Sequence, residues 1–148
     1  MRQQGFTLVE LLVVLGIITV MLLLGGWRYQ ALSTSQAENR AVNDYALLVR
    51  TAVSQAASHR QVYTINYDAT SRQFLTMNNG AVIADEALKS MVPSTVSVGT
   101  LPSPLATIRA GGRVTFNQNP VIFTSAETSR TWTVSSTGIG DVKIQGDQ

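Results

Sequence analysis

Glu10 is the residue whose chemistry fits its surroundings least, because it lies inside an apolar run that covers residues 6–26. A carboxylate at the centre of a helix in lipid costs about 2.5–3.5 kcal/mol, and less near the interface. A side chain as short as glutamate reaches the membrane surface with difficulty, so we expect a positive partner for Glu10 in the assembled state. Arg2 is one candidate, although it lacks a helical route to the site. A free α-amino group at a newly created N-terminus is the other.

The other side chains that could bind a ligand are basic and lie in the C-terminal part of the chain. Arg109 and Arg113 flank Gly111-Gly112, and this spacing fits a small phosphate-binding loop. A solvated glycine turn between two strands is the simpler interpretation. Arg130 and Lys143 complete a set of four basic residues that could contact nucleic acid. The formal net charge of +2 is too small to argue for such a partner by itself.

The sequence predicts neither an enzyme nor a metal or cofactor site. It has no cysteine and a single histidine, His59, which excludes a thiol nucleophile, disulfides and multi-histidine metal sites. The G-x-S-x-G, P-loop and H-E-x-x-H patterns are absent. Asp141 and Asp147 are too sparse for calcium, which takes about six oxygen ligands or more. We expect His59 at the exposed end of a helix and Trp132 in the core or in a hairpin.

The apolar run predicts a membrane helix, since about 20 mostly apolar residues span a bilayer. Trp27 and Tyr29 follow it, where amphipathic rings favour the membrane interface. The run is longer than the core of a signal peptide, and no A-x-A cleavage site follows it. We therefore predict a retained transmembrane helix over residues 6–29. Arg2 and Arg28 lie on opposite sides of it, so charge does not decide its orientation.

The residues Gly5-Phe6-Thr7-Leu8-Val9-Glu10, with the apolar run behind them, resemble the processing motif of type IV prepilins and pseudopilins. The resemblance implies that a prepilin peptidase cuts after Gly5, which removes residues 1–5 as a leader, and then N-methylates Phe6. It also implies that Glu10 attracts the terminal amine of a neighbouring subunit. Gly5 suits close approach by an enzyme because it has no Cβ. The leader has one basic residue where many have several, and no proline interrupts the apolar helix.

Beyond the predicted span, apolar residues at spacings of three and four indicate one face of an amphipathic helix over residues 37–58. We predict one long helix, in which residues 30–59 continue the span and residues 36–40 form a solvated neck. Two helices joined at Gly25-Gly26 are the alternative. The apolar face consists of Ala41, Val42, Tyr45, Leu48, Val49, Ala52, Val53 and Ala56.

Residues 60–148 have the pattern of a β-rich domain. Short β-branched and aromatic segments alternate with turn residues and prolines, and Asn79-Gly80 is a hairpin signal. The whole pattern predicts an α+β fold, in which an antiparallel sheet packs on the second half of the long helix. The predicted strands are residues 62–67, 73–77, 81–84, 95–98, 113–116, 121–124, 131–134 and 141–144, with a helical turn within residues 85–90.

The closing hairpin, with Thr131-Trp132-Thr133-Val134 as its first strand, resembles that of GspH/FimT-like minor pseudopilins, which include ComGD-type competence proteins. Some DNA-binding members have a Gly-Arg-x-Arg stretch near the C-terminus. The matching place here is Gly138-Ile139-Gly140-Asp141, so those DNA-binding residues do not carry over. The short chain and the absence of cysteine favour a competence protein over a secretion protein.

These observations and resemblances predict a minor pilin-like structural subunit that serves DNA uptake in competence. A minor pseudopilin of type II secretion or of type IV pilus biogenesis is the alternative, and a DNA-binding module and a single-span membrane enzyme or sensor are further ones. The expected partners are prepilin peptidase, other pilin-like subunits, the cell membrane and, for a binding role, DNA. We expect a single-pass protein of the cell (inner) membrane that enters a pilus or pseudopilus, with its C-terminal domain outside the cytoplasm.

Overall fold

The computed structural model describes residues 8–146. The chain divides into two compact units, Met1–Gln36 and Ala37–Gln148. Helix α1 (Leu8–His59) contributes residues to both of them. Because α1 runs without a break, Gly25 and Gly26 lie inside one helix, and the alternative of two helices joined at this pair is wrong.

The described residues of the first unit form the N-terminal part of α1. Their large apolar side chains, from Leu8 to Leu23, are exposed around the helix. The hydroxyl of Thr19 donates to the carbonyl of Leu15 at 2.8 Å, so this polar group is satisfied within the helix. Within residues 8–146 no helix combines the length and the apolar character that crossing a membrane requires. The predicted span begins at Phe6, outside the described residues, and stays a prediction.

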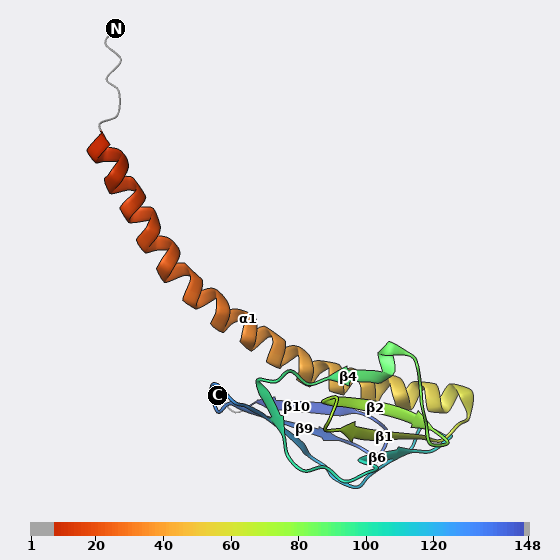
Figure 1. Ribbon diagram of the computed structural model, residues 1–148. Helices are drawn as coiled ribbons and strands as arrows, with labels where there is room; N and C mark the ends of the chain where they lie inside the picture. Colours follow the sequence, from red (N-terminus) through yellow and green to blue (C-terminus); the bar gives the residue numbers. More distant parts are fainter. Residues whose placement is uncertain (1–7, 147–148) are drawn as a thin grey trace. The chain divides into compact units, whose positions relative to one another are not determined.

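In the second unit, the rest of α1 is amphipathic, as the spacing predicted. One face is buried with 0–4 % of each side chain exposed, whereas Leu47 and Arg50 lie on the solvent side. This face contacts strands from both sheets of the domain, and Figure 1 shows the sheets beside this part of α1. Its buried members are Ala41, Val42, Tyr45, Ala46, Leu48, Val49, Ala52 and Ala56.

The first sheet has six strands among the described residues, in the order β3-β2-β1-β6-β7, with β4 also paired to β2. All of these pairs are antiparallel, and β3 and β4 occupy different parts of one edge of β2. The Asn79-Gly80 turn joins β2 to β3, with both residues at positive φ, which confirms the predicted hairpin. The strands are β1 (Tyr63–Asp68), β2 (Gln73–Asn78), β3 (Ala81–Val82), β4 (Lys89–Met91), β6 (Ala106–Ile108) and β7 (Val114–Phe116).

The second sheet has four strands within residues 8–146, in the antiparallel order β10-β9-β8-β5. The guanidinium of Arg72 holds the connection between the sheets, because it donates to the carbonyls of Val92, Pro93 and Val96. This arginine therefore serves the fold. The strands are β5 (Val96–Val98), β8 (Val121–Ser125), β9 (Thr131–Ser136) and β10 (Val142–Gly146).

Three aromatic rings join the helix to both sheets at the centre of the core. Tyr45 of α1 lies 4.5 Å from Phe74 of β2 and 5.6 Å from Phe123 of β8, and the two phenylalanine rings are 5.9 Å apart. Such tilted pairs are favourable beyond the area that they bury. Burial raises the pKa of Tyr45 well above its ordinary value, since the ionised phenolate would lose its hydration.

The α+β class is confirmed, with two differences in detail. The strands form two antiparallel sheets where one was expected, because the chain crosses from one sheet to the other after β4 and returns for β6 and β7. The predicted strand list also lacks β4 and β6, which have three residues each. The sequence predicted a helical turn over residues 85–90, which include the start of β4, and two prolines precede β6 in the sequence.

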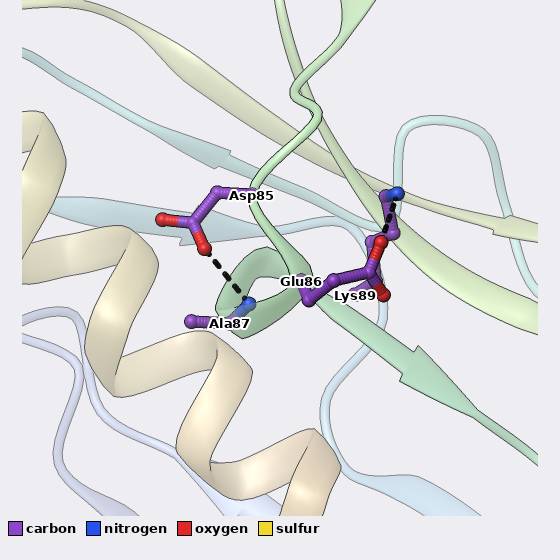
Figure 2. Close-up of polar contacts among 4 residues, drawn as sticks. All are labelled: Asp85, Glu86, Ala87 and Lys89. Carbon is purple, nitrogen blue, oxygen red and sulfur yellow. Dashed lines mark hydrogen bonds and ion pairs between the residues drawn. The ribbon is translucent and has the colours of Figure 1, made fainter.

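Two aspartates, the half-buried Asp68 and the exposed Asp85, hold turns of the first sheet. Asp68 accepts hydrogen bonds from the Ser71 hydroxyl at 2.7 Å and the Thr70 backbone N–H at 2.9 Å, which lower its pKa. Asp85 accepts from the side-chain amide of Gln55 and from the N–H of Ala87, each at 3.0 Å, and its pKa is lowered in the same way. Figure 2 shows Asp85 capping the short 3-10 helix η1 (Glu86–Leu88), the predicted helical turn.

The turn between β9 and β10 packs against α1 so closely that we expect Gly140→Ala to destabilise the domain strongly. Gly140 has φ +81°, and an added Cβ would lie 2.7 Å from a methyl carbon of Val53. The left-handed backbone costs about 1–2 kcal/mol for other residues and overpacking about 1–3 kcal/mol more. Urea unfolding of the full chain, followed by circular dichroism, measures the sum.

Gly80→Ala is the matched control for that substitution. Gly80 has φ +82°, but an added Cβ would meet no atom within 4 Å. Gly80→Ala should therefore lower the free energy of unfolding only by the backbone cost of about 1–2 kcal/mol. Adding Val53→Ala to Gly140→Ala should return part of the loss. Equal losses at Gly80 and Gly140 would contradict the close contact.

Candidate functional site

The N-terminal candidate residues are only partly within the described chain. Gly5 and Phe6, the predicted cleavage and methylation positions, lie outside the described residues. Glu10 lies in the first turn of α1 and is exposed. A carboxylate in the first turn of a helix is favoured by the positive end of the helix dipole. This part of the site is therefore a prediction from the sequence, and the structure adds that Glu10 lies in a helix.

The side chains around Glu10 form an apolar surface that nothing polar interrupts before Thr19. Leu8 is 76 % exposed, and its apolar neighbours up to Leu23 are 46–71 % exposed. A helix that is apolar on all sides is typical of segments that lie in a membrane or inside a helix bundle. The arrangement can therefore bind lipid or other helices, and it carries a single carboxylate near its beginning.

Arg109 and Arg113 form one pair of the four predicted basic contacts. They lie opposite each other at the end of the β6–β7 hairpin, where the N–H of Arg109 donates to the carbonyl of Arg113 at 2.8 Å. Ile108 and Val114, the preceding pair, are buried, so the two arginines share the other, outer face of the first sheet. Both are exposed, and the predicted glycine turn between them is present.

Arg130 and Lys143 belong to the second sheet. Lys143 pairs with Ser135 on β9, and Arg130 directly precedes β9; both are exposed. A shallow hollow of about 220 Å³ lies next to them, and no titratable side chain lines it. Its lining residues are Thr131, Thr133, Gln145 and Gly146.

The structure does not bring all four basic residues together. The turn between Arg109 and Arg113 packs on Val53 and Ala57 of α1. The loop that carries Arg130 begins at Ser125, which contacts Glu38 of α1. Glu38 and Val53 are separated by about 22 Å of helix rise. Arg130 and the arginine pair therefore lie towards opposite ends of the domain.

Glu38 is a buried carboxylate that the sequence did not predict. The neck of residues 36–40 was expected to be solvated, but only 2 % of Glu38 is exposed. The hydroxyl of Ser125 donates to its Oε1 at 2.7 Å and itself accepts from the N–H groups of Glu127 and Thr128. The prediction for this residue was wrong because its partner is 87 positions away in sequence. The network ties the β8–β9 loop to α1.

The remaining candidates occupy the structural positions that the sequence predicted. Trp132 lies on β9 with 6 % of its surface exposed, in the core. His59 lies exposed in the last turn of α1, where its Nδ1 is 3.4 Å from the hydroxyl of Tyr63. Among residues 8–146 no three histidine, aspartate or glutamate side chains are grouped as metal ligands.

Known proteins match the chain in two ways. Residues 1–26 match the family model of the prokaryotic N-terminal methylation motif. The fold is similar to that of the minor pseudopilin EpsH from the type 2 secretion system of Vibrio cholerae, with TM-score 0.56, 12 % identity, and coverage of 73 % of this chain and 95 % of that one. A second EpsH structure from the same organism gives TM-score 0.52 and 10 % identity, with coverage of 74 % and 93 %. No curated protein matches.

The two matches concern different features of the chain, the first its N-terminal motif and the second its fold. The chain has a prokaryotic methylation motif at its N-terminus and the α+β fold of a minor pseudopilin. At 10–12 % identity, the structural likeness establishes the fold alone. The partners of this chain must be inferred from its own residues.

The buried network gives a direct test of how the β8–β9 loop is held. Ser125→Ala removes the hydroxyl from a buried carboxylate, and we expect unfolding stability to fall by about 1.5–3 kcal/mol, as for other hydrogen bonds to charged groups. In a double-mutant cycle with Glu38→Ala, the coupling energy should be about 1–3 kcal/mol. Urea unfolding of the four proteins provides the values.

Glu127→Ala is the control for this cycle, because Glu127 is an exposed acid in the same loop. Its effect should stay within about 0.5 kcal/mol. Additive losses for Glu38→Ala and Ser125→Ala would mean that the hydrogen bond does not couple the loop to α1.

Proposed function

We propose that the protein is a minor pilin-like structural subunit, cut after Gly5 and N-methylated at Phe6 by a prepilin peptidase. The observation that carries the proposal is the methylation motif over residues 1–26 joined to a minor-pseudopilin fold in one chain. After processing, residues 6–29 anchor the subunit in the cell membrane with the C-terminal domain outside the cytoplasm. Other pilin-like subunits then cover the apolar surface of residues 8–23 in a pilus or pseudopilus.

In this assembly, Glu10 is the negative member of a charge pair between neighbouring subunits. Cleavage after Gly5 removes Arg2, the other basic candidate, and creates an α-amino group on Phe6. A carboxylate in apolar surroundings is stabilised by a close positive group, and the attraction is strong where water is excluded. The amine of an incoming subunit and the Glu10 of its neighbour supply such a pair. The pair aligns the two helices as the subunit enters the filament.

We propose first that the subunit belongs to a machine for DNA uptake in competence. The exposed arginines 109 and 113, which share one face of a hairpin, support a subunit that contacts DNA. A type II secretion pseudopilus is the alternative, and the fold likeness to EpsH of such a system supports it. Both machines would use the same N-terminal chemistry, so tests of processing and of Glu10 apply to either of them.

The N-terminus of the membrane-bound protein tests the processing directly. In cells with an active prepilin peptidase, mass spectrometry should find a chain that begins at Phe6 and carries one added methyl group. Cells that lack the peptidase should retain the leader of residues 1–5. A chain that still begins at Met1 in cells with the active peptidase would refute the proposal.

Substitution of Glu10 separates assembly from insertion and cleavage. Glu10→Val removes the carboxylate and makes the segment more apolar, so the chain should still insert and be cut. Its incorporation into filaments should fall at least about tenfold, because a stabilisation of 1.4 kcal/mol or more is lost. Quantitative immunoblots of membrane and sheared filament fractions measure both properties. Glu10→Asp keeps the charge and serves as the control; unchanged incorporation of Glu10→Val would remove the proposed role.

A further inference from the structure

A basic surface lies at the end of the domain where α1 finishes. Arg60 terminates α1 in the left-handed conformation, with φ 53°, and the N–H of Gln61 donates back to the carbonyl of Ala56 at 3.2 Å. Arg60 is exposed. Its position is therefore fixed by the helix cap, while its side chain is free to meet a ligand.

The β6–β7 hairpin is held against this end of α1. An added Cβ on Gly112, which has φ +76°, would lie 3.4 Å from the Cβ of Ala57 and 3.7 Å from the carbonyl oxygen of Val53. The N–H of Gly112 also donates to the carbonyl of Arg109 at 2.8 Å, which closes the turn. Arg109 and Arg113 are thus carried on a short, rigid turn next to the helix end that carries Arg60.

Threonines extend the same outer face across three strands. Thr64, Thr107 and Thr115 are cross-strand neighbours on β1, β6 and β7. Thr107 is two positions before Arg109, and Thr115 is two positions after Arg113. Thr64 is paired with Thr107 on the next strand. All three threonines therefore point to the same side of the sheet as the two arginines. Guanidinium groups match the geometry of phosphate, and threonine hydroxyls are common donors to phosphate oxygens.

The charge around this surface stays positive when its acidic neighbours are counted. In the part of the chain that the structure describes, the ion pair present is Lys89–Glu86, so none of the three arginines is paired with a carboxylate. Two acids belong to this end of the domain. Asp141 is in the β9–β10 turn, which meets β7 where Val114 N–H donates to the Gly138 carbonyl at 2.7 Å, and Asp85 accepts from Gln55 of α1 at 3.0 Å. These two carboxylates and the partial negative charge of about one half at the end of α1 leave a small excess of positive charge beside three arginines.

We propose that Arg60, Arg109 and Arg113, with the threonine row beside them, bind the phosphate backbone of nucleic acid. This inference rests on the DNA-uptake candidate and narrows it to one end of the domain, without Arg130 and Lys143. No aromatic side chain belongs to the set, and the bases are left unread, so binding is independent of sequence. The affinity follows from charge and falls steeply as salt rises.

Fluorescence anisotropy of the full chain in detergent, with a short labelled single-stranded DNA of mixed sequence, tests the site. The wild type should bind at low salt. The double substitution Arg109→Gln, Arg113→Gln should weaken binding and reduce the slope of log affinity against log salt by about 1.4, because each lost phosphate contact on a single strand removes about 0.7. Arg60→Asn, which suits the left-handed conformation, should reduce the slope by about 0.7 more.

Arg130→Gln, Lys143→Gln is the matched control, because it removes the same charge from the second sheet. Affinity and salt slope should stay at the wild-type values in this control. Equal losses in both double variants would overturn the site and indicate attraction by net charge alone. Absence of wild-type binding at low salt would also overturn it, as would binding only to anionic lipid vesicles. The proposed processing and assembly are read from the mass of the N-terminus and from filament incorporation, so they stand or fall separately.

Discussion

Burial of one face of the second half of α1 is the constraint on which the domain depends. Tyr45 contacts Phe74 from one sheet and Phe123 from the other, so three elements that are distant in sequence meet at one point. In both sheets, the face that packs against α1 is the inner one, since successive residues of a strand point to opposite faces. The outer faces, which carry the basic residues, follow from the same alternation. A substitution that separates α1 from the sheets would therefore shift every basic residue that is a candidate for ligand contact.

Much of this arrangement can be predicted from the sequence, because periodicity reports which face is buried. The spacing of Ala41 to Ala56 predicts the helix face, and Asn79-Gly80 predicts its hairpin. The strand β4 was missed because its start lies within residues 85–90, which predicted a helical turn, and β6 was missed because it closely follows Pro102 and Pro104. The burial of Glu38 depends on Ser125, and the grouping of Arg60 with Arg109 depends on the register of β1 and β6. Contacts between such distant positions leave no trace in local spacing, so the sequence alone could not reveal them.

In the proposed function, assembly and recognition use different parts of the chain. The N-terminal segment carries the methylation motif and an apolar surface with one carboxylate, which suit association with other subunits in a membrane. The folded domain has its apolar core on α1 and between the sheets, and its exposed faces carry hydroxyl, basic and some apolar side chains. Changes on these outer faces leave the core contacts intact. A minor subunit can therefore acquire a ligand without altering how it enters a filament.

The central claim, that the N-terminal segment associates with other pilin-like subunits, can be measured inside the cell. A photo-crosslinking amino acid placed at Val13, an exposed apolar position of α1, would react with whatever covers the segment. We predict an adduct with a second chain that itself carries an N-terminal methylation motif, formed only when the prepilin peptidase is active. An adduct with lipid alone, or the same protein adduct in cells without the peptidase, would contradict it.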